Sequence, residues 1–123
     1  MALVGTLIAE SLRVGSTLDG LALTVRKVSR ADAGNVDAGQ PRTWTFFEFE
    51  AADEDAAVLA GALSRALSGA GGWYCDFRSG TETFVVFAGR VFRYQRGNAV
   101  GRGEAMAYGR SVGVPDEQLD WPT

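Results

Sequence analysis

Residues 73–94 read WYCDFRSGTETFVVFAGRVFRY, and this stretch decides the fold because three short strands follow one another within it. Aromatic and β-branched residues, which favour extended backbone, fill 73–77, 82–87 and 90–94. Two short connections, RSGT at 78–81 and AG at 88–89, carry the glycines that tight turns need. The stretch therefore predicts a meander of three strands.

The middle strand of this meander, 82–87, is apolar on both faces. Successive side chains of a strand point to opposite sides, so Phe84 and Val86 face one way while Val85 and Phe87 face the other. A strand that is buried on both faces lies inside a sheet with a cover on each side. We expect a helix on one face, and the second helix, the N-terminal strands or a second copy of the chain on the other.

The remaining segments predict three more strands and two helices. We expect strands over 3–13 and 21–28, paired with each other, and a third strand over 43–50. Leucines at 59, 63 and 67 predict an amphipathic helix over 51–68, with Asp53 as N-cap and Gly69 just beyond its end. Long loops are expected over 29–42 and 95–103, and a shorter helix over 104–112, with Trp121 holding the tail to the body.

Together these elements predict a single α+β domain over residues 1–123, in keeping with the length of the chain. Its antiparallel sheet of five to six strands carries one long helix on one face and a shorter C-terminal helix. A ferredoxin-like arrangement is the alternative, because the order of elements contains a β-α-β-β core. Such a likeness of fold implies no function.

Composition excludes several classes of protein. The chain has no histidine, which removes Ser-His-Asp and Cys-His catalysis and the commonest transition-metal ligand. The net charge of −3 gives no overall attraction to nucleic acid, and we expect neither membrane insertion nor a signal peptide. A single cysteine favours a reducing compartment, so we expect a cytoplasmic protein.

One predicted sheet face mixes aromatic and charged side chains. Its members alternate along two strands, and they are Trp44, Phe46 and Glu48 on the first and Tyr74, Asp76 and Arg78 on the second. If these two strands are neighbours, the two sets meet. Tyr, Trp and Arg are enriched at recognition surfaces, so the face is a candidate site for a partner or ligand. The alternative is that other elements cover the aromatics while the charges lie at the rim.

A second candidate site is the third strand of the meander, where Arg90, Arg93 and Tyr94 could hold a phosphate, a nucleotide or an acidic segment. Neighbouring strand positions 90 and 93 point to opposite faces, which argues against a single pocket. The arginines could instead protect an edge strand from aggregation.

Two further sets of residues are interpreted as structural. Cys75, on the same side as Trp73 and Phe77, is expected to pack inward as a small hydrophobe. Acids at 48, 50 and 53–55 match no calcium loop, and the glycines at 97–103 miss the phosphate-loop and dinucleotide fingerprints. We therefore expect no metal site and no cofactor.

Two runs, GWYCDFRSGTETFVVFAGRVFRY at 72–94 and YGRSVGVPDEQLDW at 108–121, resemble small bacterial proteins of unknown function. The resemblance covers most of the chain. It implies no activity, cofactor or site.

Three functions follow as hypotheses. The first is a non-catalytic interaction protein, either a homodimer or an immunity-type partner, which predicts a flat apolar patch without a deep pocket. The second is a small-molecule binder, or a histidine-free acid/base enzyme using Asp76, Glu48 or Tyr94, which predicts a cavity with a perturbed carboxylate. The third is a nucleotide or nucleic-acid binder through the Arg-rich strand, which predicts a continuous positive patch.

Overall fold

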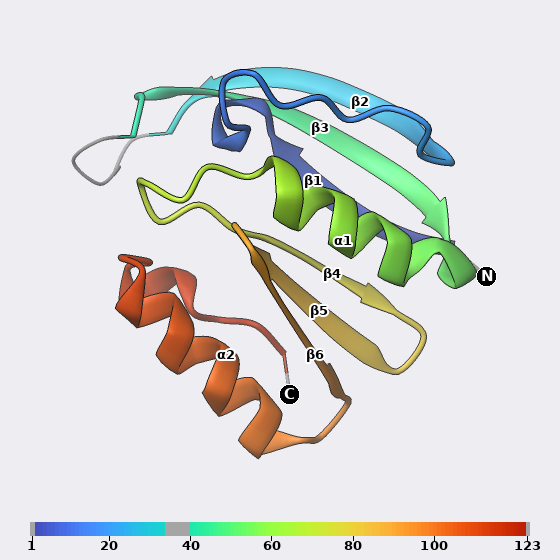
Figure 1. Ribbon diagram of the computed structural model, residues 1–123, viewed down its shortest axis with the longest axis vertical. Helices are drawn as coiled ribbons and strands as arrows, with labels where there is room; N and C mark the ends of the chain where they lie inside the picture. The colour runs from blue at the N-terminus through green and yellow to red at the C-terminus, as the bar shows by residue number, and fades with distance from the viewer. Residues whose placement is uncertain (1, 34–39, 123) are drawn as a thin grey trace.

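The computed structural model describes residues 2–33 and 40–122, which form one antiparallel sheet with helices on both faces (Figure 1). The strands are β1 (Ala2–Ile8), β2 (Leu23–Asp32), β3 (Thr43–Ala52), β4 (Cys75–Ser79), β5 (Glu82–Phe87) and β6 (Arg90–Gln95). The helices are α1 (Ala56–Ala66) and α2 (Ala99–Ser111), and 3₁₀ turns lie at Ala9–Ser11, Asp53–Asp55 and Asp116–Gln118. The predicted α+β class is confirmed. Neither α1 nor α2 is long and apolar enough to cross a lipid bilayer.

The strands are ordered β2-β3-β1-β4-β5-β6, and each neighbouring pair is antiparallel. The predicted pairing of the first two strands is wrong, because β1 lies between β3 and β4 while β2 is the edge strand beside β3. The condition that the strands at 43–50 and 73–77 are neighbours is not met, because β1 lies between β3 and β4. Charge explains the placement, since β2 carries Arg26, Lys27 and Arg30, which favour an edge, whereas β1 has no charged residue.

The connection through α1 links two strands that run parallel to each other. Both β3 and β4 are antiparallel to β1, so the chain must cross the sheet to pass from one to the other. The turn at Asp53–Asp55 leads directly into α1, which makes the helical segment 53–66 slightly longer than α2. The ferredoxin-like alternative does not describe this chain, because in that β-α-β-β-α-β arrangement a strand follows the second helix, whereas in the described residues α2 is followed by a 3₁₀ turn and no strand.

Strand β5 is buried on both faces, as its pattern predicts. On one side, Phe84 and Val86 join a core that includes Leu59 and Leu63 of α1. On the other side, Val85 and Phe87 join a second core, whose other buried members come from β6, α2 and the C-terminal segment, namely Tyr94, Ala105, Val114, Leu119 and Trp121. The cover on the second face is therefore α2 with the C-terminal segment, which runs between this helix and the strands (Figure 1).

Helix α2 begins at Ala99, five positions before the predicted start, and takes up much of the expected glycine-rich loop. Asn98 caps it, with Oδ1 accepting a hydrogen bond from the Gly101 backbone N–H at 3.0 Å. Glycine is a poor helix former, but a Cβ at Gly101 would lie 2.6 Å from Cβ of Tyr94. The glycine is what lets α2 approach β6 this closely.

The ends of α1 also differ from the prediction. The N-cap residue is Asp55, and Asp53 instead accepts a hydrogen bond from the Ser79 hydroxyl at Oδ1 (2.9 Å). The helix ends before Gly69, because Leu67 is already extended. The predicted loop at 29–42 starts later than expected, since β2 continues to Asp32, and its positions 34–39 lie outside the described residues.

The C-terminal segment is held by contacts from β6, from α2 and from the residue that precedes β4. The Tyr94 hydroxyl donates to the Pro122 carbonyl, and Nε of Arg102 donates to the Trp121 carbonyl. The Tyr74 hydroxyl donates to the Gln118 carbonyl at 3.3 Å. Trp121 is buried among the aromatic rings of the second core, so the prediction that it holds the tail to the body is confirmed.

Candidate functional site

Eight of the nine candidate residues lie on the face of the sheet opposite α1, and the exception is Arg93. Six of the eight come from two parts of the chain whose strands, β3 and β4, are not neighbours. β1 lies between them, and Phe46 and Glu48 of β3 pair with Ile8 and Thr6. On the other edge of β1, Val4 pairs with Arg78 of β4. Side chains two positions apart share a face, which places the following together: Trp44, Phe46, Glu48, Tyr74, Asp76 and Arg78.

A cavity of about 350 Å³ lies at one end of this face. We name it the β4 cavity, and it is lined by Thr6, Ile8, Gln40, Trp44, Gly72, Trp73, Tyr74, Cys75, Asp76 and Gln118. Three of the predicted candidates are therefore brought together, and they are Trp44, Tyr74 and Asp76. Phe46 lies beside the cavity, with its ring centroid 6.2 Å from that of Trp44.

Aromatic rings form much of the cavity wall, and each of them contacts another aromatic ring. Trp44 contacts Trp73 at 5.3 Å between ring centroids, and its Nε1 donates to the Pro41 carbonyl at 2.7 Å. Tyr74 lies edge-on to Trp121 at 5.3 Å. Trp73 was predicted on the side of Cys75, but it precedes β4 and lies against Trp44 instead.

A close approach of two backbone segments positions the start of this wall. Gly72 has a φ of +68°, which a residue with a side chain rarely adopts. A Cβ there would also lie 2.8 Å from the Gly113 carbonyl oxygen. The glycine before Trp73 therefore allows the chain to turn into β4 directly beneath the segment that follows α2.

Gln40 is a lining residue that the sequence did not indicate. Its side chain is 9% exposed, and Nε2 donates to the Gly71 carbonyl. Its Oε1 is buried and accepts no hydrogen bond from any described residue. Gln40 directly follows residues 34–39, which lie outside the described residues. This part of the sequence has no periodicity, so no sequence pattern indicated Gln40.

Asp76 is the acidic group of the cavity. Burial raises the pKa of its carboxyl above the ordinary value, and the charge of Asp120 raises it further, while Arg78 opposes them. Its own backbone N–H is a hydrogen-bond donor to it, and no side chain of residues 2–33 and 40–122 donates to it. A half-buried carboxylate with little direct pairing is a common feature of binding and catalytic sites.

The two titratable groups beside Asp76, the Tyr74 phenol and the Cys75 thiol, point away from its carboxylate. Burial, followed by the nearby charges of Asp76 and Asp120, raises the pKa of the Tyr74 phenol. Burial, followed by Asp76, raises the pKa of the Cys75 thiol to about 12. Cys75 belongs to the core under α1, and its Sγ lies 3.5 Å from the Thr6 carbonyl oxygen, so the prediction that it packs inward is confirmed.

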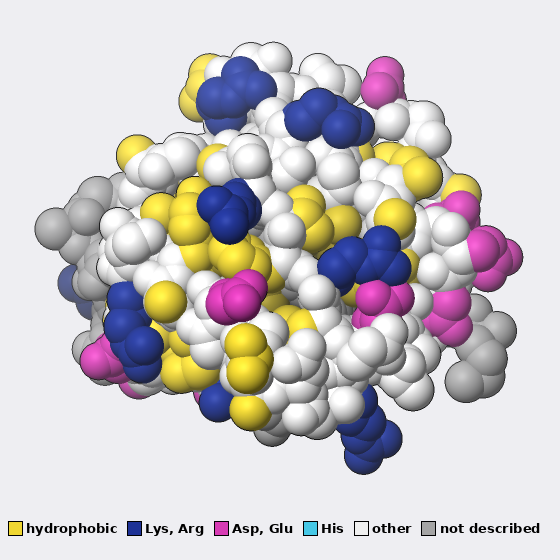
Figure 2. Space-filling view, turned by 60° about the horizontal axis from the view of Figure 1, so that its bottom comes forward, with side chains coloured by type: hydrophobic (Ala, Val, Ile, Leu, Met, Phe, Trp, Pro, Cys, Tyr) yellow, Lys and Arg dark blue, Asp and Glu magenta, His cyan; other side chains and the backbone are white. Residues whose placement is uncertain are grey.

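The second predicted site does not form a single pocket. Arg93 makes a bidentate ion pair with Glu82, at 2.7 and 2.9 Å, on the α1 side of the sheet. Arg90 lies over the Phe92 ring at 4.8 Å, and Tyr94 is buried under the C-terminal segment, both on the other side. With the end that carries α2 turned forward, Lys and Arg form separate groups among hydrophobic and neutral side chains (Figure 2).

Three of the acidic residues considered as metal ligands, Glu48, Glu50 and Asp53, form ion pairs or hydrogen bonds with neighbouring side chains. Glu48 and Glu50 form ion pairs with Lys27 (3.7 Å) and Arg26 (2.6 Å) of the neighbouring strand. Across the described residues, no three acidic or cysteine side chains converge as metal ligands would.

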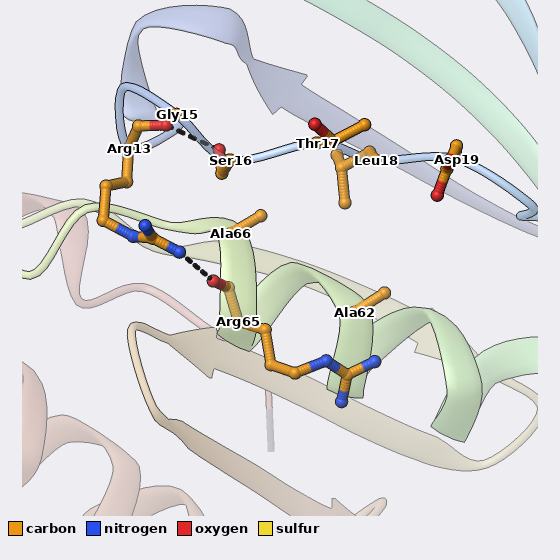
Figure 3. Close-up of a pocket in the computed structure, with 9 residues that line it drawn as sticks. All are labelled: Arg13, Gly15, Ser16, Thr17, Leu18, Asp19, Ala62, Arg65 and Ala66. Atoms are coloured by element: carbon orange, nitrogen blue, oxygen red, sulfur yellow. Dashed lines mark hydrogen bonds between the residues drawn. The ribbon is translucent and has the colours of Figure 1, made fainter.

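A larger cavity, of about 450 Å³, lies between the segment 13–19 and the end of α1. It contains two arginines, but Nη2 of Arg13 donates to the Arg65 carbonyl at 2.9 Å. The Arg65 side chain runs along the helix and away from residues 15–19 (Figure 3). The two guanidinium groups do not converge, so this cavity is a weaker candidate than the β4 cavity.

Comparisons with protein-family models, with curated proteins and with solved structures gave no match to this chain. The resemblance to small bacterial proteins of unknown function therefore stays a prediction. The functional proposal that follows rests on the β4 cavity.

Proposed function

We propose that this protein binds a small molecule in the β4 cavity. The observation that carries the proposal is the Asp76 carboxylate, which lies half-buried among aromatic rings without a side-chain partner in the described residues. The volume of about 350 Å³ is at the lower end of the range of roughly 300–1,000 Å³ that small-molecule sites occupy. Aromatic walls with a few polar groups are the usual composition of such sites.

The contacts favour binding over catalysis. A nucleophile needs a base within hydrogen-bond reach, and the two groups beside Asp76 that could act as nucleophiles are both turned away. The Tyr74 hydroxyl donates to the Gln118 carbonyl, and the Cys75 thiol lies in the core on the other side of the sheet. Raised pKa values keep both groups protonated at neutral pH.

The three tryptophans provide the test. Trp44 and Trp73 line the cavity, whereas Trp121 lies in the second core. In a screen of cationic, neutral and anionic small molecules, a ligand of the cavity should shift the NMR signals of the first two indole N–H groups more than the third. Ligands that shift all three signals alike, or none at any concentration, would contradict the proposal.

A matched pair of variants locates the ligand. Trp44→Leu removes a wall of the cavity and should weaken binding of any hit. Phe92→Leu alters a half-buried ring of the second core, away from the cavity, and should leave binding unchanged. Equal losses in both variants would point to a general loss of structure and not to the site.

The interaction protein expected from the sequence is a second candidate, and one observation favours it. The face of β1 and β3 that carries Phe46 lies opposite α1, and Val4 on this face is 66% exposed. Apolar side chains next to ion pairs are common where two proteins meet. Size-exclusion chromatography with light scattering tests it, since Val4→Lys should dissociate a homodimer that forms through this face, and a wild-type monomer would refute self-association.

A further inference from the structure

We propose that the ligand of the β4 cavity is an organic cation, with its ammonium group against the Asp76 carboxylate and its carbon substituents against the rings of Trp44 and Trp73. This inference rests on the proposed small-molecule function and gives it a chemical class. The observations that carry it are the sign of the charge at the cavity, the aromatic wall and the unused acceptors.

The charged groups around the cavity favour a positive ligand. Asp76 lines it, and Asp120 on the C-terminal segment is close enough to act on both Asp76 and Tyr74. The positive group that acts on Asp76 is Arg78, whose side chain is exposed to solvent, where water and salt screen its charge. A cation entering the cavity would neutralise a carboxylate that burial has partly stripped of water.

The wall favours an organic cation over a metal ion. The faces of tryptophan and tyrosine rings attract ammonium groups, and cages of such rings bind quaternary ammonium ligands. Calcium and magnesium instead need six or more oxygen ligands, and the cavity offers a single carboxylate. Trp44 and Trp73 both line the cavity and meet at an angle of 59°, so two indole rings are available to the carbon substituents of a cation.

Gln40 provides a second and independent observation. Its side chain is more than nine-tenths buried at the cavity wall, and its Oε1 is an acceptor that no described residue uses. Buried polar atoms are normally satisfied, so an acceptor that no described residue uses is available to a donor on a ligand. The N–H of a primary ammonium such as n-butylammonium is such a donor, and so is the hydroxyl of choline, whereas a carboxylate or phosphate ligand would place acceptor against acceptor.

The test compares cations with a neutral molecule of the same shape as choline and with an anion. Choline and n-butylammonium are the cationic probes, and dimethylbutanol, in which a carbon replaces the charged nitrogen of choline, is the neutral control. Butyrate is the anionic control. Titrations followed by the three indole N–H signals and by calorimetry should show both cations binding more tightly than the two controls, with the shifts confined to Trp44 and Trp73.

Two variants with the same net charge distinguish the effect of the Asp76 charge from the effect of the overall charge of the protein. Asp76→Asn removes the charge inside the cavity and should weaken binding of the cations roughly ten- to hundredfold, the value of a hydrogen-bonded charge pair. Asp116→Asn removes a charge from the surface ion pair with Arg110 and should leave binding unchanged. Binding of dimethylbutanol, where measurable, should be the same in both variants.

The outcomes separate this inference from the proposed function. If choline and dimethylbutanol bind equally, or if the two variants lose the same affinity, the cation inference is overturned. If only neutral or anionic molecules shift the Trp44 and Trp73 signals, the inference falls while the small-molecule function stands. If no molecule of any class shifts them at tens of millimolar, both fall.

Discussion

Replacing Phe87 by alanine tests whether α2 and the C-terminal segment cover the second face of the sheet. The Phe87 side chain is 2% exposed. Its ring lies within 6.4 Å, between centroids, of four other rings, which belong to Tyr74, Phe92, Tyr108 and Trp121. Replacing a buried Phe by Ala lowers the free energy of unfolding by about 3–5 kcal/mol, because the buried ring is lost and a cavity is left in its place. The contacts with four other rings favour the upper half of that range.

The assay is urea unfolding followed by circular dichroism, with the free energy taken by linear extrapolation. Phe84→Ala removes the equivalent ring from the core under α1 and should cost a similar amount. Val91→Ala, at a position 36% exposed on β6, is the control and should cost less than about 1 kcal/mol. If Phe87→Ala costs no more than the control while Phe84→Ala costs its full 3–5 kcal/mol, the second cover is not packed in solution and the two-core description is wrong.

Three further predictions concern single sites. Gly101→Ala should destabilise the fold by about 1–3 kcal/mol, since its Cβ would overlap Tyr94, whereas Gly103→Ala, which meets no atom within 4 Å, should stabilise α2 by up to about 1 kcal/mol in thermal melts. Because burial and a neighbouring acid raise the folded-state pKa of Asp76, its ionisation costs stability as pH rises above the ordinary aspartate value. Asp76→Asn should therefore be more stable than wild type at pH 7, with an advantage that fades below about pH 4, and urea midpoints that show no such trend would contradict this. A pKa of about 12 should keep the Cys75 thiol unreactive toward iodoacetamide at pH 8 until urea unfolds the chain, and rapid alkylation of the native protein would show that the thiol is exposed.

Local pattern predicted β5 fully, because all the information needed lies within ten residues. Apolar side chains on both faces require two covers, and the glycines on either side, Gly80 and Gly89, have the positive φ values of tight turns. The bounds of the strand are those expected from the sequence, Glu82–Phe87. The identity of the second cover was left open among three alternatives, since nothing in a strand indicates which distant segment packs on it.

Strand order could not be predicted in the same way. The hairpin expected for the first two strands would have needed only local pairing, but β1 pairs with residues 38 or more positions further along the chain. A usable signal was present, because the charges on β2 mark an edge strand and their absence from β1 favours a central position. Helix α2 started early for a tertiary reason as well, since the close contact with Tyr94 outweighs the poor helix propensity of Gly101.

The candidate site was predicted in part, by a route that was partly wrong. Two sets of side chains were expected to meet if their strands were neighbours, and this condition is not met. They share a face even though β1 separates them, since the period of two holds across any number of strands in register. Gln40 and Gln118 were missed because both come from segments without periodicity, and their place at the cavity depends on the path of the chain around the sheet.

The position of the β4 cavity follows from where the second cover stops. On the face opposite α1, α2 and the C-terminal segment cover the half of the sheet made by β4, β5 and β6, while Val4 of β1 remains exposed. Gln118, at the border of this cover, lines the cavity together with Trp44, which comes from the far side of β1. The border between the covered half and the uncovered half of this face is concave, because the cover rises above the open part of the sheet. A carboxylate at this border loses part of its hydration and gains no side-chain donor from the described residues, which explains why burial raises the pKa of Asp76. The proposed cationic ligand would supply the missing counter-charge.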